Sequence, residues 1–217
     1  MLALLWKDLL LEFRTKERLS SLFVLSFLIV LVFVFALSPE QIQSPTIEAA
    51  LLWVTLVFAG MMGLQRSFLL EQERACFSGL LLSPIDPGTL FLAKMLSNVL
   101  FLLLVELLVA PLSLAFFGVP FSRSLLPLPV VLLLGTVGFS ALGTLFAAIA
   151  VRTRAREVLL PIMLLPLLVP LLIAAVKVTS AVLTGGEWNG VWFRVLLAFD
   201  IIFVVTGWLI FPQVVQE

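Results

Sequence analysis

Histidine and tyrosine are absent from this chain of 217 residues, and cysteine occurs only once, as Cys76. Without histidine, the chain lacks the commonest metal ligand in proteins and the usual general base of enzymes. A lone cysteine excludes an intrachain disulfide, and we interpret Cys76 as an incidental thiol. Charged residues are also scarce, at 12% of the chain, and the formal net charge of +0 argues against nucleic acid as a partner.

Motifs for nucleotide, metal or nucleophile chemistry are missing as well. The sequence contains no G-x-x-x-x-G-K-[ST], no H-E-x-x-H, no C-x-x-C and no G-x-S-x-G. We therefore expect no catalytic residues, no metal site and no tightly bound cofactor in this chain. If the protein uses ATP, hydrolysis is expected on a separate subunit.

Apolar residues, in contrast, dominate the chain. They make up 62% of it, and the mean hydropathy of +1.24 is too high for an ordinary soluble surface. Apolar runs of roughly 18 or more residues are candidate membrane-spanning helices. The sequence predicts an all-α integral membrane protein, one membrane domain over residues 1–217. Its six spans are expected at about 19–37, 49–70, 90–117, 129–151, 158–176 and 192–211.

Residues 1–18 are predicted to form an amphipathic helix at the membrane interface. Leu2, Leu5, Trp6 and Leu9 follow helical spacing on one side, and charged residues fill the other. The alternative is a simple topological anchor without a further role.

Lysine and arginine orient the six predicted spans. With a cytoplasmic N-terminus, all thirteen of these residues except Arg123, Lys177 and Arg194 lie at cytoplasmic positions. The positive-inside rule therefore places both termini in the cytoplasm. It also places the polar segment 71–88, between the second and third spans, on the cytoplasmic face.

This segment has a helical pattern in its first half. Glu71, Arg74 and Ser78 share one side, and Phe77 shares another with two leucines. Pro84 and the residues after it then stop the helix and turn the chain back. Such a segment fits a short helix through which a cytoplasmic partner transmits a conformational change to the spans. The alternative is a solvated connecting loop.

Glu106 and Asp200 are the two carboxylates predicted to lie inside spans. A charged side chain near the bilayer centre costs about 3 kcal/mol on insertion scales, so it usually faces the bundle interior or a wet cavity. One interpretation is a polar or proton-linked pathway. The other is a buried hydrogen bond to a neighbouring helix, with Ser97, Asn98 or Ser140 as partners.

Small and kinking residues mark two further spans. Gly135, Gly138 and Gly143 give the fourth span small residues that suit close helix packing. Three prolines in the fifth span, Pro161, Pro166 and Pro170, predict a strongly bent or broken helix.

The order and spacing of several motifs resemble a known family. The run from Leu70 to Pro84, followed by Lys94 in Leu-Ala-Lys, resembles the cytoplasmic segment after span two of ABC-2-type permeases. Over nearly its full length, the chain resembles the CcmB family, the haem exporter B subunits of cytochrome c maturation. The remaining matches are the Trp-Lys-Asp-Leu start, the Leu-Leu-Leu-Gly135-Thr-Val-Gly138 run and the proline-rich fifth span.

The resemblance implies an ABC-2-type permease bundle in the cytoplasmic (inner) membrane, surrounded by lipid. It implies an ATPase partner, CcmA, with the membrane proteins CcmC and CcmD, in a complex that releases the haem-loaded chaperone CcmE. Two copies of the chain per complex are expected. The segment after span two would be the coupling helix, with its contacts to the ATPase made by Glu71, Glu73, Arg74, Phe77, Gly79, Leu82 and Pro84.

Haem would at most be a transient substrate of this subunit, because no histidine or tyrosine is present to ligate it; Met61, Met62 or apolar contacts could hold it briefly. The alternatives are an ABC-2-type permease for a lipid, polysaccharide or drug, a proton-coupled secondary transporter that uses Glu106 and Asp200, and an intramembrane enzyme. A secondary transporter would show interrupted helices in matching repeats.

Overall fold

The computed structural model describes residues 16–73, 86–119, 123–151 and 156–216. The predicted interfacial helix over residues 1–18 lies outside this part except for its last three residues, which are helical. Cys76 and most of the polar segment 71–88 also lie outside it.

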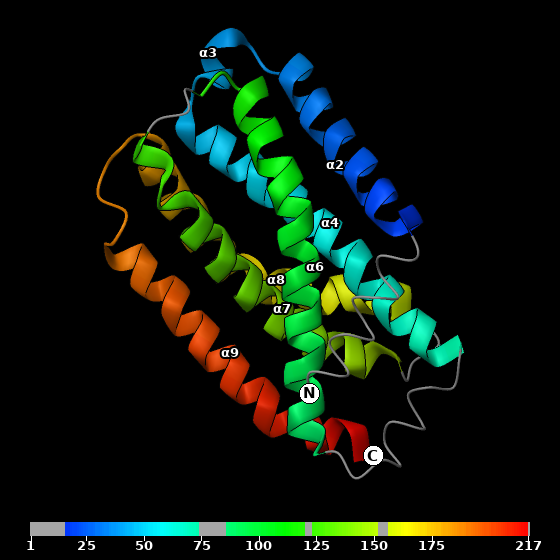
Figure 1. The fold of residues 1–217 in the computed structure, drawn as a ribbon. Coiled ribbons are helices and arrows are strands. Elements are labelled where there is room, and N and C mark those ends of the chain that lie inside the picture. Colours follow the sequence, from blue (N-terminus) through cyan, green and yellow to red (C-terminus); the bar gives the residue numbers. More distant parts are fainter. Residues whose placement is uncertain (1–15, 74–85, 120–122, 152–155, 217) are drawn as a thin grey trace.

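Every regular element in the described ranges is a helix, which confirms the predicted all-α class (Figure 1). In chain order they are α2 (Lys16–Ala36), α3 (Pro39–Ile42), α4 (Pro45–Glu73), α6 (Pro87–Phe116), the 3₁₀ turn η1 (Arg123–Leu125), α7 (Leu128–Val151), α8 (Arg156–Leu183) and α9 (Val191–Gln216). Five of them, α4 and α6 to α9, are long and apolar enough to cross a membrane. The apolar part of α2, Ser20–Ala36, is shorter. The architecture is that of an integral membrane helical bundle.

Local capping signals explain where several helices begin and end. The carboxylate of Asp86 accepts a hydrogen bond from the backbone N–H of Thr89 at 3.0 Å, and Pro87 occupies the first turn of α6. Two residues after the last residues of α6 and α8 come Gly118 and Gly185, whose φ angles are 72° and 68°. Glycine adopts this left-handed conformation without the steric cost that a side chain adds.

Prolines do not interrupt the helices in which they occur. α8 is a continuous helix through all three of its prolines, so of the two predicted outcomes, a bend or a break, the break does not occur. Pro166 and Pro170 are exposed on the outside of the bundle. α6 likewise continues through Pro111. Each proline removes one backbone hydrogen bond, and the surrounding turns keep the helix intact.

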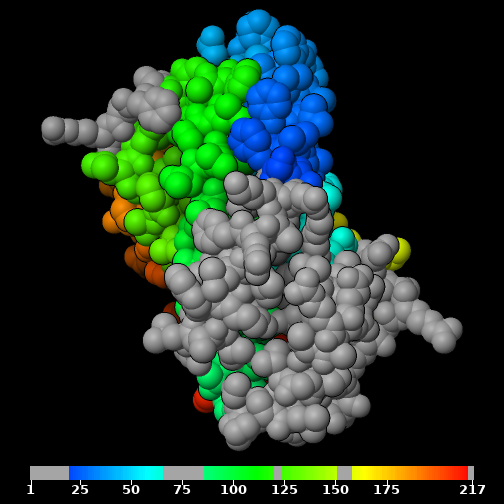
Figure 2. All heavy atoms as spheres, turned by 45° about the vertical axis from the view of Figure 1, so that its right-hand side comes forward, coloured from blue at the N-terminus to red at the C-terminus, as the bar shows by residue number. Residues whose placement is uncertain are grey.

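α4 and α7 form the centre of the bundle. About 72% of the most apolar window of each is buried, against 33% for α8 and 28% for α9. α7 contacts α4, α6, α8 and α9. α2 packs against α4 and α6, and Figure 2 shows its side chains beside those of α6 in the upper part of the molecule. Polar groups on α4 and α7 are therefore held in the protein interior.

Candidate functional site

A row of polar side chains runs along the contact between α6 and α7. The hydroxyl of Thr136 donates a hydrogen bond to Oε1 of Glu106, and the amide nitrogen of Asn98 donates to Oγ1 of Thr144 at 2.9 Å. Asn98 precedes Glu106 on α6 by eight residues, about two turns, whereas Thr144 follows Thr136 on α7 by eight residues. This is the order that antiparallel helices require. Ser140 lies between the two pairs on α7. We call these five residues the polar seam.

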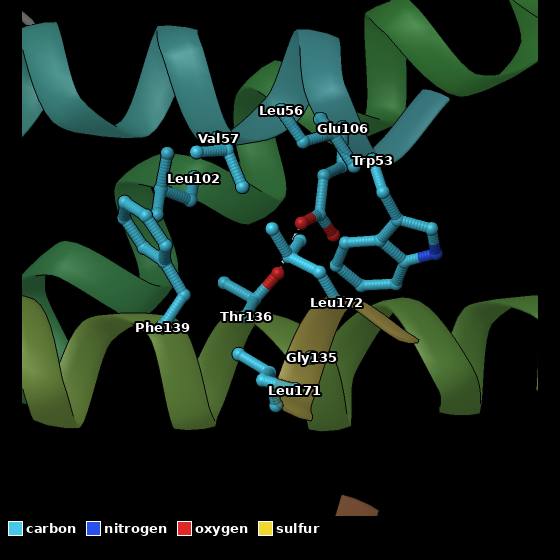
Figure 3. A pocket seen from close by; sticks show the side chains of 10 residues that line it. All are labelled: Trp53, Leu56, Val57, Leu102, Glu106, Gly135, Thr136, Phe139, Leu171 and Leu172. Atoms are coloured by element: carbon cyan, nitrogen blue, oxygen red, sulfur yellow. Dashed lines mark hydrogen bonds between the residues drawn. The ribbon is translucent and has the colours of Figure 1, made fainter. Parts of the chain in front are cut away.

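Glu106 is the only carboxylate of the seam, and it is almost fully buried, with 4% of its surface exposed. Figure 3 shows its carboxyl group between Thr136 of α7 and the indole ring of Trp53 of α4. The second oxygen, Oε2, has no hydrogen-bond partner among the described residues. The pocket around the carboxyl group has a volume of about 10 Å³, close to the smallest cavity that holds one water molecule.

Glu106 makes a buried hydrogen bond to a neighbouring helix, as one of the two interpretations predicted. Its partner is Thr136, however, and not Ser97, Asn98 or Ser140. Asn98 bonds to Thr144 instead, and the hydroxyl of Ser140 has no partner among the described residues. The sequence did not single out Thr136. Its spacing of four and eight residues from Ser140 and Thr144 is the signal that could have identified it.

Asp200 is also buried, with 6% of its surface exposed, on the opposite side of α7 from the seam. Both of its carboxyl oxygens lack hydrogen-bond partners among the described residues. Asp200 packs against Gly138, and a Cβ atom at Gly138 would overlap its Oδ1. Residues two apart on a helix, such as Thr136 and Gly138, face nearly opposite directions. Glu106 and Asp200 therefore contact different sides of α7 and do not form a carboxylate pair.

A side chain from a neighbouring helix packs directly against each glycine of α7. Gly135 receives the ring of Trp53, Gly138 receives Asp200 and Leu171, and Gly143 receives Leu64. A Cβ atom at any of these positions would overlap the neighbour. The same arrangement occurs at Gly60 of α4, which packs against Phe139.

Polar contacts also join α4 to α8. The indole N–H of Trp53 donates to Oγ1 of Thr179 at 2.9 Å, and the hydroxyls of Thr46 and Ser180 lie 3.1 Å apart. Trp53 therefore packs on Gly135 of α7 while it bonds to α8. This one side chain fixes three helices relative to one another.

Glu48 lies just before the expected start of the second span at about residue 49, but in the structure it is already part of α4. α4 begins at Pro45, which places Glu48 in its first turn. Only 3% of the surface of Glu48 is exposed, and its Oε1 has no hydrogen-bond partner among the described residues. The exposed N–H groups of a first turn favour negative charge, whereas the burial of Glu48 opposes it.

The residues predicted to contact an ATPase lie at or beyond the end of α4. α4 extends to Glu73, so the backbone of Glu71 and Glu73 continues this helix rather than starting a new one. The others, Arg74, Phe77, Gly79, Leu82 and Pro84, lie outside the described residues. Their role stays a prediction.

Comparisons with known proteins extend over nearly the whole chain. The family model described as "CcmB protein" matches residues 1–216. Heme exporter protein B of Pseudomonas aeruginosa is 32% identical over 197 residues, which cover 90% of this chain and 88% of the relative. Heme exporter protein B of Rhodobacter capsulatus is 35% identical over 174 residues, covering 80% and 79%.

A third relative, heme exporter protein B of Bradyrhizobium diazoefficiens, is 28% identical over 188 residues, which cover 85% of this chain and 83% of the relative. The family match includes both the helical bundle and the segments outside the described residues. The chain therefore belongs to the CcmB family.

Proposed function

We propose that this chain is the permease subunit of an ABC-type haem exporter that acts in cytochrome c maturation. The observation that carries the proposal is the CcmB family match over residues 1–216, together with three relatives named heme exporter protein B. The helical bundle supports it, because five apolar helices of spanning length leave no room for a soluble catalytic domain within the described residues.

ATP is bound and hydrolysed on a separate CcmA-like subunit in this proposal. The sequence has no P-loop motif, so the energy must come from outside the chain. The coupling surface is the cytoplasmic end of α4 and the segment that follows it to Pro84. Both termini lie in the cytoplasm, and the bundle lies in the inner membrane with two copies per complex. CcmC-like and CcmD-like proteins complete the complex, which releases the haem-loaded chaperone CcmE.

A proton-coupled secondary transporter is disfavoured by the helices themselves. Such transporters bind their substrates at interrupted helices near the membrane centre. α4 and α6 to α9 are continuous over their described lengths, and the carboxylates of Glu106 and Asp200 contact different sides of α7. An ABC-2-type permease for a lipid, polysaccharide or drug remains the alternative outcome of the experiment below.

The experiment replaces the native gene by charge-reversal variants and measures holo-cytochrome c by haem staining. Glu71→Lys with Arg74→Glu is expected to abolish holo-cytochrome formation and co-purification of the ATPase, while the chain stays in the membrane. Glu40→Lys is the matched control, because Glu40 is exposed on α3 at the other end of the bundle. Deletion of the gene with unchanged holo-cytochrome would refute the haem assignment. Coupled ATPase activity that survives the double reversal would refute the coupling surface alone.

A further inference from the structure

The first turns of α6 and the last turns of α9 interlock at one end of the bundle. A Cβ atom at Gly88 of α6 would overlap the indole of Trp208, and a Cβ atom at Gly207 of α9 would overlap the ring of Phe91. Phe91 also packs against Phe211 of α9, with their ring centroids 5.5 Å apart. We call these five residues the α6–α9 junction. Each helix places an aromatic ring directly on a glycine of the other.

This reciprocal packing resists sliding of α6 along α9. Phe91 and Phe211 are fully buried, and closely packed interiors have low compressibility and transmit strain. A shift along the helix axis would press the ring of Trp208 or Phe91 against a side chain of the next turn, because residues three and four apart lie on the same helix face. Figure 1 shows that α6 and α9 meet at this end and separate toward the other. The two helix ends are therefore expected to move together.

Trp208 lies where the polar segment 71–88 enters α6. The Cβ position at Gly88 that overlaps Nε1 of the indole is also 3.0 Å from Oδ2 of Asp86. The same carboxylate oxygen caps α6 by accepting a hydrogen bond from the backbone N–H of Thr89. The indole of α9 thus lies beside the residue that joins the segment to α6.

We propose that the α6–α9 junction carries the motion of segment 71–88 to α9, with Trp208 as the positioning residue. When an ATPase displaces the segment, the start of α6 moves with it, and the interlocked rings take the end of α9 along. This inference rests on the proposed function, because it takes the segment as the coupling surface. It gives α9, which is far from the segment along the chain, a part in the response to ATP.

The test separates ATP hydrolysis from the response of the bundle. Haem staining of gene-replacement strains gives holo-cytochrome c per folded chain, and purified complexes in lipid nanodiscs give ATPase co-purification and ATP hydrolysis. Trp208→Ala is expected to keep co-purification and hydrolysis at the wild-type level, while holo-cytochrome falls by at least about fivefold, the lower end of typical coupling effects. Trp208→Phe keeps an aromatic ring beside Gly88 and should retain most of the wild-type holo-cytochrome.

Gly60→Ala is the matched control, since its Cβ atom overlaps the ring of Phe139 in the same way, but between α4 and α7. It is expected to lower the amount of folded chain and to leave the ratio of holo-cytochrome to hydrolysed ATP at the wild-type value. If Trp208→Ala fails to fold, Gly88→Ala replaces it as the test. Its Cβ atom displaces the indole, which is 46% exposed and can turn outward without leaving a cavity.

Three results would overturn the proposal. They are wild-type holo-cytochrome per folded chain in Trp208→Ala or Gly88→Ala, loss of ATPase co-purification in either variant, and an equal fall of the ratio in Gly60→Ala. The proposed function is tested separately by the gene deletion and the double charge reversal, in which the junction residues are not altered. Its failure is therefore distinguishable from failure of the junction.

Discussion

Replacing Thr136 by valine tests how much the hydrogen bond to Glu106 stabilises the bundle. Valine keeps the branched shape of threonine and removes only the hydroxyl, so packing between α6 and α7 changes little. Glu106 would then have no hydrogen-bond partner for either oxygen among the described residues.

The magnitude follows from the burial of Glu106. Leaving a buried polar group unpaired costs about 1–3 kcal/mol in soluble proteins, whereas hydrogen bonds between membrane helices average about 0.6 kcal/mol in mutant cycles. With 4% of the Glu106 surface exposed, water does not replace the lost partner. We expect Thr136→Val to lower the free energy of unfolding by about 1–2 kcal/mol. Thr136→Ser, which retains the donor, should lose less.

The assay is reversible unfolding in detergent micelles, followed by tryptophan fluorescence, in a double-mutant cycle. The four proteins are the wild type, Thr136→Val, Glu106→Leu and the double variant. A coupling energy of about 0.5 kcal/mol or more is expected, since the two side chains interact directly. Additive effects within about 0.3 kcal/mol would refute the hydrogen bond as a stabilising contact. Thr144→Val, which breaks the corresponding bond to Asn98, serves as the comparison within the same seam.

Three further predictions concern the packing and polar contacts of α4, α7 and α9. Gly143→Leu forces the new side chain against Leu64, an overpacking that costs about 1–3 kcal/mol of stability. The yield of folded protein in size-exclusion chromatography should therefore fall, and an unchanged yield would contradict the close contact. Trp53→Phe keeps an aromatic ring packed against Gly135 of α7 but loses the hydrogen bond to Thr179. The free energy of unfolding should fall by about 1 kcal/mol, and an unchanged value would show that this hydrogen bond contributes nothing. Asp200→Asn should leave cytochrome c maturation intact, because an amide costs less to bury than a carboxylate; loss of maturation in a folded protein would instead assign Asp200 a proton-linked role.

Composition and apolar run length alone predicted the helical membrane class, because continuous apolar runs of about 18 or more residues satisfy their backbone hydrogen bonds in lipid within a helix. The same patterns marked Glu106 and Asp200 as unusual, since carboxylates inside spans are costly wherever they lie. The helix ends were less predictable. The second span extends in both directions, and Glu48 moves from a loop into α4, because tertiary packing covers its first turn.

Only the tertiary structure decided what the intramembrane polar groups contact. A spacing of eight residues on α6 and of four residues on α7 is visible in the sequence, but the register between the two helices depends on how they pack. That register pairs Glu106 with Thr136 and sets Asp200 against Gly138 on the other side of α7. It also leaves one oxygen of Glu106 without a hydrogen-bond partner among the described residues. The sequence determines which polar groups must be buried, and the packing of α7 among four neighbours determines which of them find partners.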